Sequence, residues 1–227
     1  MNKKTITLIA VLLFPSILYI ILATGKNNFI HLQFFGPKEI KTTIVQGKEQ
    51  KDTVYFTIPP FKFINQKGDT ITEKDYEGKI YVTDFFFTSC QSICPKMSEQ
   101  LLKVQQKFMD NDSVLILSHT VNPENDSVAA LAAYAKKVHA IDKKWNFVTG
   151  DKHTIYDIAR NGYFVTAMKG DGGPDDFIHS ETLILVDKEK HIRGIYDGTN
   201  AKDVDRLIDE IKVLLAEYIV HSNKDDL

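Results

Sequence analysis

The sequence predicts an α/β protein with one folded domain, and three observations lead to this class. The chain has 227 residues, enough to bury one sizeable hydrophobic core. Short runs rich in β-branched and aromatic residues alternate with segments of helical period. This alternation indicates crossover connections and a mostly parallel central sheet flanked by helices. The hydrophobic fraction of 43% is too high for an intrinsically disordered chain.

The N-terminal segment is predicted to be a transmembrane helix. Thr5–Thr24 is a run of twenty residues without a charge, and a helix of that length spans about 30 Å, the thickness of a hydrocarbon core. Lys3 and Lys4 precede the run, whereas only Lys26 follows it closely, so the rest of the chain is expected on the extracytoplasmic side. A cleaved signal peptide is the alternative. The sequence therefore predicts a single-pass protein of the cell membrane with its soluble part facing the periplasm or another extracytoplasmic space.

The remaining elements are predicted in chain order. Residues 26–52 are polar with scattered apolar positions, which is typical of a stalk and N-terminal extension with short strands. Strands are predicted at 53–58, 61–64, 79–87, 114–118, 145–148, 182–186 and 192–196. Helices are predicted at 95–109, 126–139, 154–161 and 200–219. Asn200 is a suitable N-cap for the last helix, and a β-hairpin is expected around Asp187–Lys190.

This order divides the chain into four parts. We expect an anchor at residues 1–25, an extension at 26–52, the folded domain at 53–222 and a polar tail at 223–227.

The charge balance of the chain argues against one class of binding partner. The chain has 28 basic and 30 acidic residues, so no net attraction toward phosphate backbones exists and nucleic acid is not an expected partner.

The two cysteines form the sharpest local feature. Cys90 and Cys94 follow a predicted strand and come directly before Pro95 at the start of a predicted helix. Proline suits the first helical position, so Cys94 is expected at a helix N-terminus, where free amides favour a thiolate. Two cysteines in one loop can close a disulfide when oxidised, or present two soft ligands when reduced. A purely stabilising bridge explains the pair poorly, because closing so short a loop removes little chain entropy.

The chain around this pair resembles the Sco/SenC family of thioredoxin-fold copper chaperones, which help assemble the binuclear copper centre of cytochrome oxidase. The family pattern F-x-x-x-C-x-x-x-C-P is matched by Phe86, Cys90, Cys94 and Pro95. The segment SHTVNPENDS at 118–127 is similar to the family's S-x-D-P-x-x-D loop, with Asn122 in place of the usual aspartate. The resemblance covers roughly residues 55–218 and implies a thioredoxin-like domain.

The resemblance also implies a third metal ligand, a histidine that lies late in the fold and directly before a strand. His179 occupies that place, although Ile178 stands where many members carry an aspartate. The implied ligands of one copper ion are therefore Cys90, Cys94 and His179. The donor chemistry agrees, because two thiolates and one imidazole form a soft set suited to copper. Structural zinc would ordinarily want a fourth protein ligand.

Asp84 and His119 are further candidates for a role near the cysteines. Asp84 is an acid within an apolar predicted strand, where burial would disfavour its charged form. Resemblance to thioredoxins suggests an outer-shell role for it, and the alternative is that it caps a turn or faces water at a sheet edge. His119 ends a strand, yet we expect it to be an ordinary surface or capped histidine. The same expectation holds for His31, His139, His153, His191 and His221.

The resulting main hypothesis is a membrane-anchored metallochaperone that delivers copper to the copper-bearing subunit of cytochrome c oxidase. Its main rival is a thiol:disulfide oxidoreductase that keeps the cysteines of that subunit reduced, with Cys90 and Cys94 cycling through a disulfide. A thiol reductase would be a partner in either case. A peroxide-reducing relative is the third alternative, since a T-x-x-C pattern is matched only loosely at residues 87–90.

Overall fold

The computed structural model describes residues 31–45, 48–165 and 180–225, together with residues 2–4, 11, 13–17 and 19. The chain falls into two compact units, Met1–His31 and Leu32–Leu227. Most of the uncharged N-terminal run, and the whole of 166–179, lie outside the described residues. Within the described part, no helix is both long enough and apolar enough to cross a bilayer.

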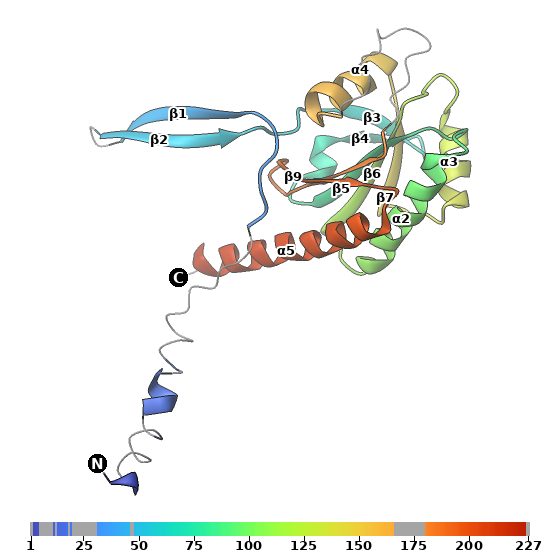
Figure 1. Cartoon of the computed structure of the whole chain (residues 1–227). Coiled ribbons are helices and arrows are strands. Elements are labelled where there is room, and N and C mark those ends of the chain that lie inside the picture. The colour runs from blue at the N-terminus through green and yellow to red at the C-terminus, as the bar shows by residue number, and fades with distance from the viewer. Residues whose placement is uncertain are drawn as a thin grey trace. The chain divides into compact units, whose positions relative to one another are not determined.

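The second unit is built on a sheet of seven strands in the order β4-β3-β7-β6-β5-β8-β9 (Figure 1). Its strands are β3 (Lys62–Asn65), β4 (Thr70–Thr72), β5 (Ile80–Phe86), β6 (Val114–Thr120), β7 (Trp145–Thr149), β8 (Thr182–Val186) and β9 (Ile192–Asp197). Six of them lie where a strand was predicted, within a few residues at each end. The short strand β4 was not predicted, because three residues carry too little pattern to stand out.

Only the centre of this sheet is parallel. Strand β6 pairs in parallel with β5 and β7, whereas β3 with β4, β3 with β7, β5 with β8 and β8 with β9 are antiparallel pairs. The prediction of a mostly parallel sheet is therefore wrong, and the sheet is mixed. Tight hairpins account for two of the antiparallel pairs, because the short connections from β3 to β4 and from β8 to β9 can join only antiparallel strands. The other two, β3 with β7 and β5 with β8, pair strands that are far apart in the sequence. The second hairpin turns at Asp187–Lys190, as predicted.

The helices α2 (Ile93–Lys107), α3 (Val128–Lys137), α4 (Lys152–Asp157) and α5 (Ala201–Asp225) all correspond to predicted helices. The end of the third predicted helix is instead a π-helix at Ile158–Gly162, and a 3₁₀ turn at Glu73–Tyr76 precedes β5. Asn200 caps α5, because its side-chain oxygen accepts the N–H of Lys202 at 3.0 Å.

Helices cover the sheet so that β5, one of its interior strands, is fully enclosed. Every residue of β5 is buried, which explains why this strand reads as a continuous apolar run. Its even-numbered apolar residues belong to the cluster that contains Leu101 of α2 and Leu207 of α5. Its odd-numbered aromatic residues belong to a second cluster with Phe63 and Tyr163. The cysteines lie in the first of these clusters.

The region before the domain forms a separate hairpin. Strands β1 (Lys38–Val45) and β2 (Lys48–Tyr55) pair in an antiparallel sheet of their own (Figure 1). The chain joins the main sheet through a bridge between Phe35 and Ile192. The sequence predicted short strands within residues 26–52 and a separate strand at 53–58 as part of the folded domain. Residues 53–55 are instead the end of β2. The outward-facing Ile40 and Ile44 show why the pattern was weak, since no buried face enforces alternation.

Candidate metal and thiol site

The two cysteines lie at the junction between β5 and α2. The chain leaves β5 at Phe86 and turns so that the Cys90 N–H donates to the carbonyl oxygen of Phe87 at 3.2 Å. Helix α2 begins at Ile93, two residues earlier than predicted, so Cys94 and Pro95 both lie in its first turn. Proline is tolerated there because the first N–H groups of a helix have no partner within the helix.

The junction brings the two sulfurs together and covers them. Cys90 and Cys94 are unbridged, and their exposed fractions are 7% and 2%. The backbone N–H of Cys94 donates to the Sγ of Cys90 at 3.4 Å, and the Oγ of Ser92 lies 3.8 Å from the same sulfur. The free amide at the helix start is therefore aimed at Cys90. The pairing of the two thiols in one small site is what either metal binding or disulfide chemistry requires.

The two thiols differ sharply in acidity. Burial opposes ionisation of Cys90, yet hydrogen bonds from Cys94 and Ser92 outweigh it and lower the pKa of the Cys90 thiol. Burial, together with the hydrogen bond that Cys94 donates to Cys90, raises the pKa of the Cys94 thiol far above its usual range. The expectation that the helix start favours a thiolate at Cys94 is therefore wrong. The amide that would stabilise the charge lies on Cys94 itself and is donated to Cys90, which becomes the readily ionised thiol.

Asp84 is buried in β5, an interior strand of the sheet, with an exposed fraction of 3%. It therefore neither faces water at a sheet edge nor caps an exposed turn. Burial raises the pKa of Asp84 to about 7, against a hydrogen bond from Ser118 that lowers it. Ser118 in turn accepts the Nε1–H of Trp145 at 2.8 Å. This chain of donors was not predicted, because it depends on β5 and β6 pairing with Asp84 opposite Ser118.

The two histidines considered from the sequence have different outcomes. His179 lies outside the described residues, so its role as a ligand stays a prediction. His119 is completely buried, and its ring is surrounded by those of Phe61, Phe63, Phe85 and Tyr163. Neither ring nitrogen has a hydrogen-bond partner among the described residues. His119 is therefore a core residue, and the expectation of a surface or capped histidine is wrong, because aromatic rings enclose its ring on the inner face of the sheet.

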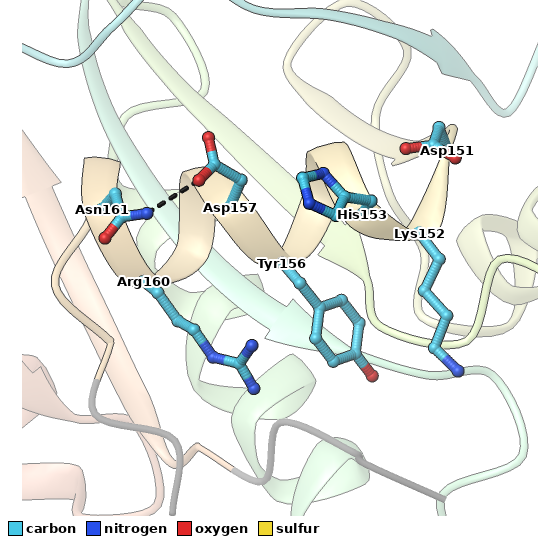
Figure 2. A pocket seen from close by; sticks show the side chains of 7 residues that line it. All are labelled: Asp151, Lys152, His153, Tyr156, Asp157, Arg160 and Asn161. Carbon is cyan, nitrogen blue, oxygen red and sulfur yellow. Dashed lines mark hydrogen bonds between the residues drawn. The ribbon is translucent and has the colours of Figure 1, made fainter. Parts of the chain in front are cut away.

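A pocket of about 390 Å³ lies along α4 and the π-helix that follows it (Figure 2). Its lining residues are Asp151, Lys152, His153, Tyr156, Asp157, Arg160 and Asn161. Neither cysteine belongs to this lining. Figure 2 shows Lys152, Tyr156 and Arg160 on one side of the helix and His153, Asp157 and Asn161 on the other. The cations of Lys152 and Arg160 lie 5.8 and 5.5 Å from the Tyr156 ring centroid, which orders this face of the helix.

Another group of potential ligands was not predicted. The ligand atoms of Asp187, Glu189 and His191 lie within 4.8 Å of one another at the β8–β9 hairpin. Asp187 is already paired with Arg193 at 3.0 Å, and its Oδ1 accepts the N–H groups of Glu189 and His191. These contacts already provide the Asp187 carboxylate with hydrogen-bond donors and a cation. We therefore interpret the cluster as a group that stabilises the hairpin rather than as a metal site.

Comparison with known proteins agrees with this arrangement. The model of the family described as SCO1/SenC matches residues 49–216. The chain belongs to the SCO1/SenC family. The match includes the β5–α2 junction with both cysteines, and it also extends through the later strands to α5. The fold is accordingly the thioredoxin-like fold of this family, and this expectation from the sequence is confirmed.

Individual family members are similar over most of the domain. A SCO1 protein homolog of Bacillus subtilis is 29% identical over 167 residues, which cover 73% of this chain and 86% of the relative. The solved structure of Arabidopsis thaliana ScoI with copper bound is 30% identical, covers 72% of this chain and 100% of that one, and has a TM-score of 0.58. The match to the full-length Arabidopsis and human mitochondrial relatives spans about half of their length, 47% and 51%.

A third similar structure bears on the thiols. BsSco, a member of the Sco family of cytochrome c oxidase assembly proteins in which a disulfide switch was identified, is 28% identical. The similarity covers 70% of this chain and 93% of that one, with a TM-score of 0.60. The similar proteins therefore include one whose structure was solved with copper bound and one in which a disulfide switch was identified.

Proposed function

We propose that this protein is a copper metallochaperone that delivers copper to the copper-bearing subunit of cytochrome c oxidase. The observation that carries the proposal is the pairing of two buried thiols at the start of α2, with one of them made readily ionisable by the other. Membership of the SCO1/SenC family and the copper-bound structure of the Arabidopsis relative support it.

Cys90, Cys94 and His179 are the proposed ligands. Copper is the cargo, and these residues form the soft donor set that it prefers. Cys90 supplies the first thiolate, because its hydrogen bonds already favour the charged form. Cys94 gives up its proton when the metal binds, since a coordinating thiol is deprotonated by the ion. Three protein ligands leave the coordination open, which transfer to a partner requires.

Asp84 is the proposed outer-shell residue. Its carboxylate is close enough for its charge to contribute to the raised pKa of Cys94, after the larger effects of burial and of the bond to Cys90. A group with a pKa of about 7 can change charge when the neighbouring thiol loses its proton. Asp84 would thereby limit the build-up of negative charge inside the core.

The place of action is the extracytoplasmic side of a membrane. The proposal depends on the uncharged run at residues 5–24 acting as a retained anchor. Thiols in such a compartment are exposed to oxidising conditions. A thiol reductase is therefore part of the proposed cycle, because Cys90 and Cys94 must be reduced before they bind copper.

Thiol:disulfide exchange is the second candidate function. It is favoured by the unequal acidity of Cys90 and Cys94, because exchange needs one nucleophilic thiolate beside a second, resolving thiol. The disulfide switch identified in BsSco supports the same chemistry. In this function the target would be the cysteines of the same oxidase subunit, which must be reduced to accept copper.

Copper binding by the full-length reduced protein tests the main proposal. Titration with Cu(II) is expected to produce a sulfur-to-copper charge-transfer band that saturates at one ion per chain. His179→Ala is expected to weaken binding and shift the band, whereas His153→Ala, which removes an exposed histidine of the α4 pocket, leaves both unchanged. Unchanged affinity and spectrum in His179→Ala would remove His179 from the ligand set, and a protein that binds no copper would overturn the proposal.

The reduction potential of the cysteine pair separates the two functions. It is measured by equilibration with glutathione or dithiothreitol buffers, beside the copper titration. Tight copper binding is the result expected of a metallochaperone. A strongly reducing pair together with negligible copper affinity would instead favour thiol exchange.

A further inference from the structure

Asp126 is a buried acid that the proposed function has not yet used. It lies in the connection between β6 and α3, and its exposed fraction is 1%. Among the described residues, no lysine or arginine forms an ion pair with it. A carboxylate in such a place is costly unless hydrogen bonds compensate its lost hydration. The groups that donate hydrogen bonds to the Asp126 carboxylate therefore indicate which segments this residue holds in place.

Three donors bind the carboxylate of Asp126. The backbone N–H of Thr88 donates to Oδ2 at 3.1 Å, and the hydroxyl of Thr88 donates to Oδ1 at 2.5 Å. The hydroxyl of Thr120, at the end of β6, donates to Oδ2 as well. One carboxylate thus joins the end of β6 to the segment that leaves β5.

Thr88 is two residues before Cys90 in the sequence. Phe87, next to it, accepts the N–H of Cys90 at 3.2 Å, and Phe86 accepts the N–H of Val121 at 2.8 Å. The start of the cysteine loop is therefore fixed from the side of the β6–α3 connection. Thr88 belongs to neither element that flanks the loop, since β5 ends at Phe86 and α2 begins only at Ile93. Its position is therefore not fixed by the hydrogen bonds of a strand or a helix.

We infer that Asp126 is the positioning residue of Cys90, acting through Thr88. Asp126 accepts hydrogen bonds from both the N–H and the hydroxyl of Thr88 and so fixes the conformation of the loop. In this conformation the Cys90 sulfur accepts the N–H of Cys94. When the hydrogen bonds from Thr88 to Asp126 are lost, the loop gains conformational freedom, and the Cys90 sulfur moves away from the N–H of Cys94 for part of the time. The two sulfurs are then held together for less of the time.

The relevance of this inference to copper rests on the proposed function, but its test does not. The metal-free, full-length protein is equilibrated with reduced and oxidised glutathione at a fixed pH, and the free thiols are trapped and counted. This gives the equilibrium constant for closing the Cys90–Cys94 disulfide, a step in which one glutathione disulfide is consumed and two glutathione thiols are released. Asp126→Ala is expected to lower the constant about tenfold, because the constant follows the effective concentration of one thiol at the other. This measurement does not depend on copper, so a protein that binds no copper would contradict the proposed function and leave the role of Asp126 unaffected.

Asp126→Asn distinguishes position from charge. An amide oxygen in the place of Oδ2 can still accept from Thr88 N–H and Thr120, while its NH₂ group donates to the rotatable hydroxyl of Thr88. The disulfide equilibrium constant of this variant is therefore expected to lie within about twofold of the wild-type value, because the geometry of the loop is retained. An Asn variant whose constant falls as far as that of the Ala variant would show that charge and not position matters, and would overturn the inference.

Asp151→Ala is the matched control. Asp151 accepts the backbone N–H and the hydroxyl of Thr154, at 2.9 and 3.0 Å, both through Oδ1. These are the same two donor groups of a threonine that Asp126 binds at Thr88. Asp151 belongs to the connection between β7 and α4, so its loss is expected to leave the disulfide equilibrium constant of the cysteine pair unchanged. A similar decrease in Asp151→Ala would mean that general loosening of the fold is responsible, and the inference would be wrong.

Thr88→Val keeps the inference testable if Asp126→Ala does not fold. Valine has nearly the shape of threonine and keeps the backbone N–H, so only the bond to Oδ1 is lost. We expect the disulfide equilibrium constant to fall by about twofold to threefold, because the bond from the Thr88 N–H still holds part of the loop in place. A folded Thr88→Val or Asp126→Ala protein with the wild-type constant would overturn the inference.

Discussion

Asp84 and His119 are both completely enclosed by the fold, yet they lie on opposite faces of the same sheet and meet different surroundings. Asp84 pairs across the sheet with Ser118, while His119, the next residue, pairs with Phe85. The Asp84 face carries the cysteines in its apolar cluster, and the His119 face is lined by aromatic rings.

Hydrogen bonding is what separates the two. Asp84 accepts the hydroxyl of Ser118, which is itself bonded to Trp145. His119 has no partner for either nitrogen among the described residues. A buried titratable group that belongs to a hydrogen-bond network beside reactive thiols is a candidate for function. A buried group that is enclosed only by aromatic rings lowers the stability of the core without such a role. Burial alone therefore does not mark a functional residue.

The comparison has a consequence for stability, because the two groups respond to pH with opposite sign. Burial raises the pKa of Asp84 to about 7 and lowers the pKa of His119 to about 3. The folded state holds the Asp84 proton more tightly than the unfolded state does, so this contribution is lost as pH rises through about 7. The unfolded state holds the His119 proton more tightly, so that contribution is lost as pH falls below the usual histidine pKa. The two trends partly cancel in the wild type.

Asp84→Asn is expected to give the largest effect. Asparagine has nearly the shape of aspartate but does not titrate. The unfolding free energy of the variant therefore lacks the decrease between pH 4 and 8 that Asp84 causes in the wild type. A shift of about three pKa units corresponds to about 4 kcal/mol at most. Urea unfolding at several pH values measures the difference in slope between wild type and variant. Parallel pH profiles for the two proteins would show that Asp84 titrates normally and is not the buried acid described here.

His119→Leu is expected to act in the opposite direction and slightly less strongly. Leucine has a similar volume and no polar atoms, so the variant avoids the cost of keeping the imidazole neutral. At pH 4 it is expected to exceed the wild type in unfolding free energy by about 3 kcal/mol, and by less at neutral pH. The same urea series checks this. A variant less stable than wild type at pH 4 would mean that His119 has an unrecognised partner.

The thiols on the Asp84 face offer a third test. Because the pKa of Cys90 is lowered and that of Cys94 is raised, iodoacetamide at pH 7 is expected to label Cys90 at least about a hundredfold faster than Cys94. Mass mapping of partly labelled protein gives the ratio. Equal labelling of the two cysteines would contradict the assignment of Cys90 as the nucleophile and first ligand.

Ser118→Ala is expected to have the smallest effect and to sharpen the comparison most directly. It removes the donor to Asp84 and the acceptor for Trp145, so that Asp84 comes to resemble the unpartnered His119. The loss is expected to cost about 1–2 kcal/mol of unfolding free energy and to raise the pKa of Asp84 further. Thr83→Val is a suitable control, because Thr83 also bonds across β5 and β6, through the carbonyl of Leu117, but on the other face. An Ala variant whose Asp84 titrates as in wild type would argue against the network.

Local patterns in the sequence determined where most elements begin and end. The apolar run of β5, the helical stripe of α5 with Asn200 before it, and the hairpin at Asp187–Lys190 were all predicted, because each signal is complete within a few neighbouring residues. The cysteine loop was found in the same way, since strand, cysteines and proline are contiguous, and the family match followed from these contiguous motifs.

Only the tertiary structure decided which groups meet. The mixed pairing of the sheet, the donation of the Cys94 N–H to Cys90, and the contact of Asp84 with Ser118 all depend on the register between distant segments. The grip of Asp126 on Thr88 joins residues that are 38 positions apart. The physical reason is that acidity and hydrogen bonding are set by burial and by neighbours in space, whereas residue type and local period are properties of the chain alone.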